Sequence, residues 1–96
     1  MKILTLNDNS QFTHLFFCEG CGCGHGFNTI PNRGVPTWSY NNDSESPTIQ
    51  PSILVRSGNA NGPTVCHSFV TAGRIQYLPD STHPLAGQTV ELTDMD

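Results

Sequence analysis

The chain has 96 residues, of which 35% are hydrophobic and only 12% are charged, and its formal net charge is −4. Its four Lys and Arg residues are scattered, so it lacks the clustered cations that displace phosphate counterions, and nonspecific nucleic-acid binding is not favoured. No apolar run approaches the roughly 20 residues that span a bilayer, and the N-terminus has no secretory-signal pattern. We therefore expect one soluble, cytoplasmic domain over residues 1–96, with a frayed tail at 93–96.

The apolar segments are short, rich in β-branched and aromatic residues, and separated by turn residues, which is typical of strands. In chain order we expect strands over residues 2–6, 13–17, 27–30, 37–40, 52–55, 64–70, 74–78 and 88–92. We expect turns at 7–10 and 71–73 and a flexible loop at 58–63. Pro47 and Pro51 argue against a central strand between them.

No segment shows a helical apolar stripe of useful length, and Gly and Pro are abundant. The sequence therefore predicts an all-β fold, a small antiparallel sheet or sandwich with long loops. A core this small and polar leaves a narrow margin of stability, which a structural metal would widen.

The cysteines follow the pattern of a metal site. Cys18 and Cys21 have the two-residue spacing of a zinc knuckle, Cys23 follows at once, and the fourth cysteine stands in Cys66-His67. Gly22 permits a left-handed backbone after the second knuckle cysteine, which frees amide N–H groups to face the sulfurs. In a reducing cytosol such clustered thiols bind metal more often than they form disulfides, so we expect Zn²⁺.

The ligand set stays open at this level. Neighbours on a strand point to opposite faces, so only one of Cys66 and His67 would reach the metal unless the strand bulges or begins there. His83 lies in a loop and is free to turn inward, whereas His25 is a weaker candidate. The six candidate ligands are Cys18, Cys21, Cys23, Cys66, His67 and His83.

A site with three or more thiolates is a poor Lewis acid, so a closed structural site is favoured over a catalytic one. The alternative is a metal-dependent hydrolase that uses His67 or His83 with Asp80 as the general base. Ser52 and Ser68 are possible hydroxyl nucleophiles, but hydrogen bonding within a turn or strand explains them better. An enzyme is therefore not the favoured interpretation.

Longer motifs resemble a family of small phage and prophage proteins of unknown function, often labelled "ammonia monooxygenase", a label that this soluble chain does not support. The motifs are Cys21-Gly22-Cys23-Gly24-His25, Trp38, Pro47-Thr48-x-x-Pro51-Ser52-Ile53-Leu54, Cys66-His67-Ser68-Phe69-Val70, Gly73-Arg74-Ile75-x-Tyr77-Leu78 and Asp80-x-Thr82-His83 with the 85–90 segment. Some also resemble, distantly, a zinc domain found near bacterial ubiquitin-like conjugation genes. That resemblance implies Cys21, Cys23 and His67 as ligands, with Cys66 or Cys18 completing the set. Relatives often carry Cys at position 81, where this chain has Ser81.

Together these features predict a phage-encoded zinc protein that acts in the host cytoplasm by binding a host or phage protein. The alternatives are the metal-dependent hydrolase and a minor virion or assembly component. The sequence indicates no particular oligomeric state.

Overall fold

The computed structural model describes residues 1–7, 11–59 and 62–95, which contain eight strands in two antiparallel sheets and no helix. The first sheet has the order β1-β2-β3 and the second the order β4-β5-β6-β7-β8. The strands are β1 (Leu4–Thr5), β2 (His14–Cys18), β3 (Cys23–Phe27), β4 (Ser39–Tyr40), β5 (Ile49–Asn59), β6 (Gly62–Thr71), β7 (Arg74–Tyr77) and β8 (Thr89–Glu91). The predicted all-β fold is confirmed.

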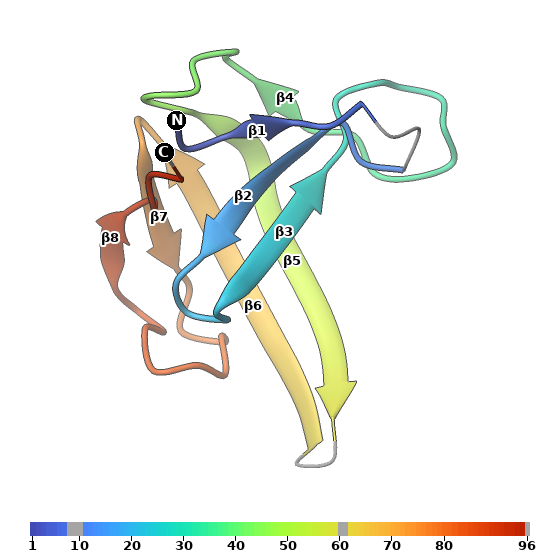
Figure 1. The fold of residues 1–96 in the computed structure, drawn as a ribbon. Coiled ribbons are helices and arrows are strands. Elements are labelled where there is room, and N and C mark those ends of the chain that lie inside the picture. Colours follow the sequence, from blue (N-terminus) through green and yellow to red (C-terminus); the bar gives the residue numbers. More distant parts are fainter. Residues whose placement is uncertain (8–10, 60–61, 96) are drawn as a thin grey trace.

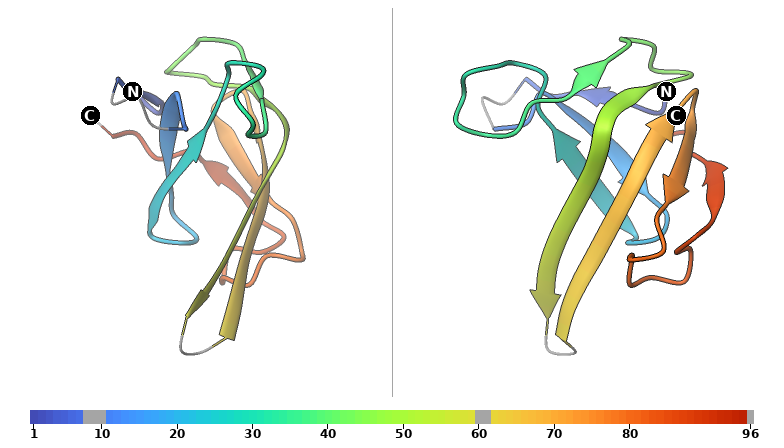
Figure 2. Two further views of the ribbon diagram at one scale, coloured as in Figure 1. Left: turned by 90° about the vertical axis from the view of Figure 1, so that its right-hand side faces the viewer. Right: turned by 180° about the vertical axis from the view of Figure 1, so that it is seen from behind.

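The two sheets form two layers, with β2 and β3 lying across β5 and β6 (Figures 1 and 2). The side chains between the layers are almost wholly buried because alternate residues of each strand face inward. This core consists of Ile3, Phe16, Cys18, Phe27, Ile49, Ile53, Cys66, Val70, Ile75, Tyr77 and Leu92. Two of its members are cysteines from different sheets, Cys18 and Cys66, so the metal-site pattern lies where the layers meet.

The third strand differs from the prediction. It covers Cys23–Phe27, whereas the sequence indicated a strand at 27–30 and a loop over the glycine-rich segment. After the tight turn at 19–22, β3 pairs with β2 residue by residue, from Cys18 opposite Cys23 to His14 opposite Phe27. Local composition misleads here because the turn and the facing strand, rather than β-propensity, hold the glycines in place.

The fifth strand begins at Ile49, runs through Pro51 and lies between β4 and β6, so the expectation that the two prolines exclude a central strand there is wrong. Its ladder with β6 shifts register between Ile49 and Ile53, so three residues of β5 face one of β6. This bulge takes Pro51 out of the regular ladder, which is where a proline is tolerated. The bulge also sets the direction of the next residue, Ser52.

The predicted 58–63 loop is instead the end of a long hairpin, because Gly58 pairs with Pro63 and Asn59 with Gly62. The predicted turn at 7–10 lies mostly outside the described residues, as do positions 60 and 61.

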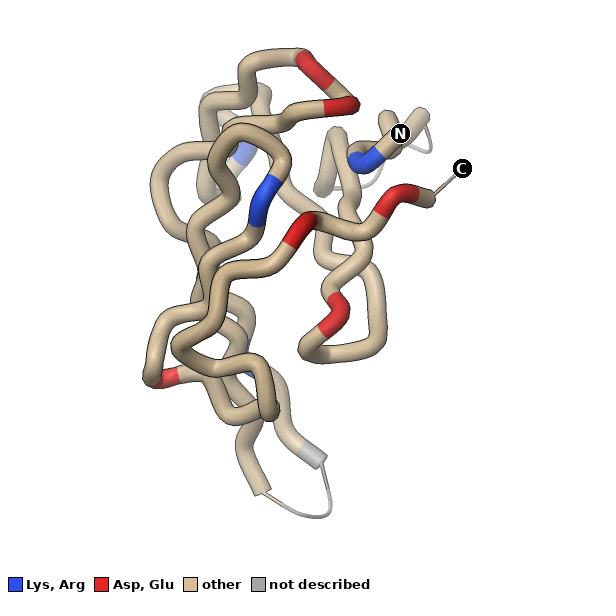
Figure 3. The backbone as a smooth tube through the Cα atoms, turned by 90° about the vertical axis from the view of Figure 1, so that its left-hand side faces the viewer, with Lys and Arg blue, Asp and Glu red and all other residues tan. Residues whose placement is uncertain are grey.

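Glu91 of β8 forms ion pairs with Lys2, near the N-terminus, and with Arg74 of β7. Lys2 Nζ lies 2.9 Å from a carboxylate oxygen of Glu91, and Arg74 Nε lies 3.2 Å from the other oxygen. Figure 3 shows the cationic positions separated along the backbone and mixed with acidic ones. Within residues 1–7, 11–59 and 62–95, no helix has the length and apolar character needed to cross a membrane.

Candidate metal centre and candidate active site

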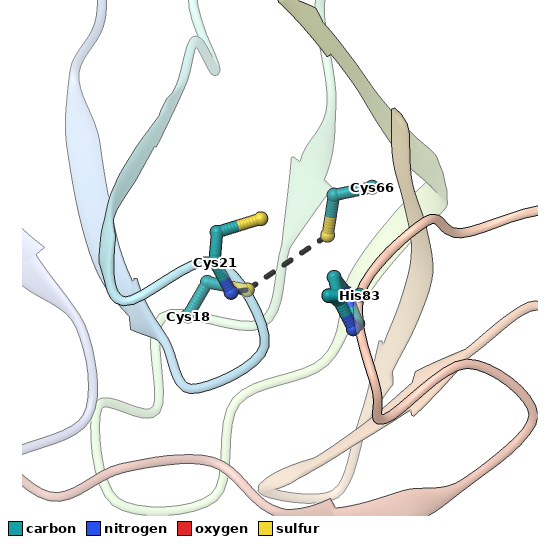
Figure 4. Close-up of side chains that lie close together, drawn as sticks. All are labelled: Cys18, Cys21, Cys66 and His83. Atoms are coloured by element: carbon teal, nitrogen blue, oxygen red, sulfur yellow. Dashed lines mark hydrogen bonds between the residues drawn. The ribbon is translucent and has the colours of Figure 1, made fainter. Parts of the chain in front are cut away.

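Four predicted ligands converge between the two sheets. One ligand atom from each of Cys18, Cys21, Cys66 and His83 lies within 4.8 Å of all the others. Cys18 ends β2, Cys21 lies in the turn that follows, Cys66 lies in β6, and His83 lies in the loop after β7 (Figure 4). The group therefore joins three segments that are far apart in the sequence.

The turn after β2 has the geometry expected of a knuckle. Gly22 has a φ of +69°, and its N–H donates to the Cys18 carbonyl at 2.8 Å. The Cys21 N–H lies 3.4 Å from the Cys18 sulfur, which accepts it. The left-handed glycine thus closes the turn and lets an amide face a sulfur, as the sequence predicts.

The approach of His83 depends on Gly20, because a Cβ there would lie 2.3 Å from the imidazole ring. The Tyr77 hydroxyl lies 3.2 Å from the Cys18 sulfur, with which it shares a hydrogen bond, and it accepts the Gly20 N–H at 3.2 Å. The Tyr77 ring also packs edge-on against His83, with centroids 4.4 Å apart. One buried tyrosine therefore braces both the knuckle and the histidine.

The three sulfurs perturb one another strongly. The Cys66 thiol, 3.8 Å from the Cys18 sulfur, is the main reason that the pKa of Cys18 falls to about 3. Its hydrogen bond to Cys18, and then its burial, raises the pKa of Cys66, while burial and then the Cys18 charge raise that of Cys21 to about 11. A cation among the sulfurs would relieve this crowding of negative charge.

The donor set fits zinc. Three sulfurs and one imidazole are a common structural zinc set, which fills all four tetrahedral positions. His83 Nε2 is buried and has no hydrogen-bond partner among the described residues, which is costly unless the nitrogen has another use.

The other two predicted ligands lie outside this group. Cys23 is exposed in β3, and His67 points to the opposite face of β6 from Cys66. Of the neighbours Cys66 and His67, between which strand alternation allows only one to face the metal, Cys66 is the one that lies in the group. Of the set implied by the distant resemblance, Cys21 and both alternatives for the fourth ligand, Cys18 and Cys66, belong to the group, whereas Cys23 and His67 do not.

His67 instead links a serine and an aspartate. Its Nε2 lies 3.1 Å from Ser52 Oγ, and its Nδ1 lies 3.1 Å from Asp80 Oδ2. An ionised carboxylate only accepts hydrogen bonds, so Asp80 holds the proton on Nδ1 and leaves Nε2 free to accept from the serine. This order of nucleophile, base and orienting carboxylate is that of a serine hydrolase triad.

Backbone geometry fixes each member of this relay. The Ser52 carbonyl accepts the Trp38 indole N–H at 3.2 Å. The His67 N–H donates to Ser81 Oγ at 3.0 Å, and the same hydroxyl donates to the His67 carbonyl at 3.1 Å. Ser81 thus fastens the loop that carries Asp80 to the strand that carries His67.

Comparison with known families places these residues in context. A family model described as a bacterial ubiquitination-like system serine protease (BubE) matches residues 1–78. The chain belongs to this family. No curated protein and no solved structure matches the chain.

The family match covers Ser52 and His67 but ends before Asp80 and His83. The third member of the relay and the fourth candidate ligand therefore lie outside the family match, although the sequence had already marked both residues as candidates. The expected link to bacterial ubiquitin-like conjugation agrees with the family description, whereas phage origin and a host partner stay predictions.

Sequence reasoning considered Ser52 but preferred a hydrogen-bonding role, and it joined Asp80 and His67 only through a metal. The available signal was strand alternation, which turns His67 away from Cys66 and leaves it for another use. Nothing local revealed that the bulge at Pro51 would bring Ser52 beside it.

Proposed function

We propose that this protein is a serine protease with Ser52 as nucleophile, His67 as general base and Asp80 as the carboxylate that orients His67. The observation that carries the proposal is the continuous hydrogen-bonded chain from Asp80 through His67 to Ser52, with 3.1 Å at each step. The family description, which names a serine protease, supports the same reaction class.

In the acylation step, Ser52 Oγ attacks the carbonyl carbon of the scissile amide while its proton passes to His67 Nε2. Asp80 accepts the Nδ1–H bond and stabilises the imidazolium that forms. The tetrahedral intermediate then breaks its C–N bond, and the Nε2 proton moves to the departing amine. The products of this half-reaction are the amine and an ester on Ser52.

In the deacylation step, water attacks the ester carbonyl and gives a proton to His67 Nε2. The C–O bond to Ser52 breaks, the carboxylic acid product leaves, and the proton returns to Ser52 Oγ. The relay is then restored, and the balance is one amide and one water converted to one acid and one amine.

Zinc would bind at Cys18, Cys21, Cys66 and His83, where it would supply a structural crosslink between the sheets. Its thiolate-rich ligand set, and its position on the opposite face of β6 from His67, support a role outside the reaction. This interpretation replaces the metal-dependent hydrolase considered from the sequence, because His67 and Asp80 work with a serine.

The substrate class that we propose is a peptide or isopeptide bond on a protein of a bacterial ubiquitination-like system, following the family description. The expectation of a protein partner then becomes that of a protein substrate.

The decisive experiment is labelling with an alkyl fluorophosphonate, followed by intact-mass and peptide mapping. Wild-type protein is expected to gain one phosphonyl group on Ser52, and Ser52→Ala is expected to gain none. Ser57→Ala, on the same strand but the other face, is the matched control and should label like the wild type. A wild-type protein that binds one zinc, is folded and yet resists the reagent would refute the proposal.

A further inference from the structure

Within the part of the chain that the structure describes, the outer edge of β5 has main-chain groups without a strand partner beside the proposed nucleophile. β4 pairs with β5 only at Ile49 and Gln50. From Ser52 onward, β6 is the one strand partner of β5 within the described residues. Figure 2 shows this half of β5 at the border of the larger sheet.

The hydrogen bonds of β6 identify the β5 residues whose main-chain N–H and C=O groups point to that edge. The His67 N–H and C=O bond to Ser81 Oγ and the Leu78 N–H, at 3.0 and 2.8 Å. Val65 likewise bonds through both groups to Thr82, at 3.0 and 2.9 Å. Both residues therefore direct their main-chain groups away from β5.

Leu54 lies directly opposite His67, and Arg56 lies directly opposite Val65. In an antiparallel ladder, directly opposed residues alternate between bonded and non-bonded pairs, so these two pairs are non-bonded. The N–H and C=O groups of Leu54 and Arg56 consequently point to the free edge. Two residues earlier, the Ser52 carbonyl faces the same way and accepts the Trp38 indole.

A small apolar pocket of about 280 Å³ follows the same edge. It begins at Trp38, the residue bonded to the Ser52 carbonyl, and its further walls include Phe12, Val35, Pro36, Ile53 and Leu54. Its volume is just below the roughly 300–1,000 Å³ typical of sites that enclose a small ligand, so it suits a single side chain.

We infer that the substrate is an extended polypeptide segment that adds as a strand to the β5 edge and pairs with Leu54 and Arg56. An apolar side chain close to the scissile bond occupies the pocket beside Trp38. Strand addition supplies main-chain hydrogen bonds that do not depend on sequence, and the pocket supplies selectivity. This inference rests on the proposed function, because it assigns the substrate that Ser52 attacks.

The first test alters one N–H of the edge. Arg56→Pro removes the N–H that faces the edge, and proline is tolerated where an edge strand has no partner. Arg56→Ala removes the side chain and keeps the N–H. The probes are acetyl-tetrapeptide diphenyl phosphonates, which label the nucleophilic serine through a peptide. We expect Arg56→Pro to label Ser52 about three- to tenfold more slowly than Arg56→Ala, which corresponds to the loss of one hydrogen bond.

The second test changes the probe instead of the edge strand, so it can be carried out even if Arg56→Pro does not fold. N-methylation of the probe should slow labelling at alternate positions only, because successive strand residues face opposite edges. At one position of the peptide, a probe with leucine should label Ser52 faster than a probe with alanine. Filling the pocket by Val35→Trp should abolish that preference. Ile30→Trp, in the same loop but outside the pocket lining, is the matched control.

These outcomes separate the two proposals. Labelling of Ser52 by the alkyl fluorophosphonate, without any alternating effect of N-methylation or any apolar preference, would overturn the strand-addition inference alone. Failure of both reagents would overturn the proposed function. A wild-type dimer that Arg56→Pro converts to a monomer would identify a second copy of the chain as the occupant of the edge and would also overturn the inference.

Discussion

Cys66 and His67 are neighbours in β6, yet their side chains leave the sheet on opposite faces and enter different sites. Cys66 points inward, is 2% exposed and belongs to the metal group. The His67 side chain points outward, is 24% exposed and contacts Ser52 and Asp80. The same division recurs in the loop after β7, where Asp80 contacts His67 in the outer site and His83 lies with the cysteines in the inner site. One strand and one loop thus contribute residues to the candidate metal centre on one face of the sheet and to the proposed catalytic relay on the other.

The comparison predicts that damage to the inner site, Cys18, Cys21, Cys66 and His83, removes both the stability of the fold and the reactivity of Ser52. Cys66→Ser deletes a ligand from the closed set, and zinc contributes about 10 kcal/mol or more to small domains, which is comparable with their whole stability. We expect this variant to bind no stoichiometric zinc and to show no cooperative thermal transition and no Ser52 labelling. Elemental analysis and circular dichroism measure the first two.

Cys23→Ser is the matched control for that change, because Cys23 is exposed and lies outside the metal group. It should keep one zinc per chain and unfold at the wild-type temperature. Loss of zinc from Cys23→Ser, with zinc retained by Cys66→Ser, would reverse the ligand assignment.

Damage to the outer site should instead separate activity from stability. His67→Gln removes the base that accepts the Ser52 proton, a group that contributes about 10²–10⁴-fold to such reactions. We expect fluorophosphonate labelling to slow by about 10³-fold, with zinc content unchanged and stability lowered by about 1 kcal/mol or less. A zinc-free His67→Gln protein would show that His67 supports the metal site.

Asp80→Asn should have a smaller effect on labelling than His67→Gln. The Asp80 side chain is 60% exposed, so water and salt screen its attraction for the imidazolium. We expect labelling to slow about 10- to 100-fold, below the ~10⁴-fold loss known for a buried triad aspartate. Labelling rates at low and high salt provide the check, because the wild-type advantage over Asp80→Asn should shrink as salt rises.

Sequence reasoning reached the inner site more fully than the outer one, for a physical reason. Zinc ligation demands particular residue types, so Cys18, Cys21, Cys66 and His83 were all among six candidates. A triad uses common residues whose meaning depends on position, and position here depends on the bulge around Pro51. The all-β class followed from short β-branched segments, whereas β3 and the bulge depended on pairing with distant strands.

The smallest expected effect tests whether a brace of the inner site influences the outer one. Tyr77→Phe removes the hydroxyl that joins the Cys18 sulfur to the Gly20 N–H. Leaving the Gly20 N–H unpaired, and removing one partner of the Cys18 sulfur, should cost about 1–3 kcal/mol and weaken zinc binding about 10- to 100-fold, as loss of a group that supports a ligand does. In excess zinc, however, the loop carrying Asp80 stays fastened through His83 and Ser81, so labelling of Ser52 should match the wild type. Zinc competition with a chromophoric chelator measures the affinity, and labelling at saturating zinc measures the coupling. Slow labelling at full zinc occupancy would mean that the two faces of β6 are not independent and that the metal site tunes the relay directly.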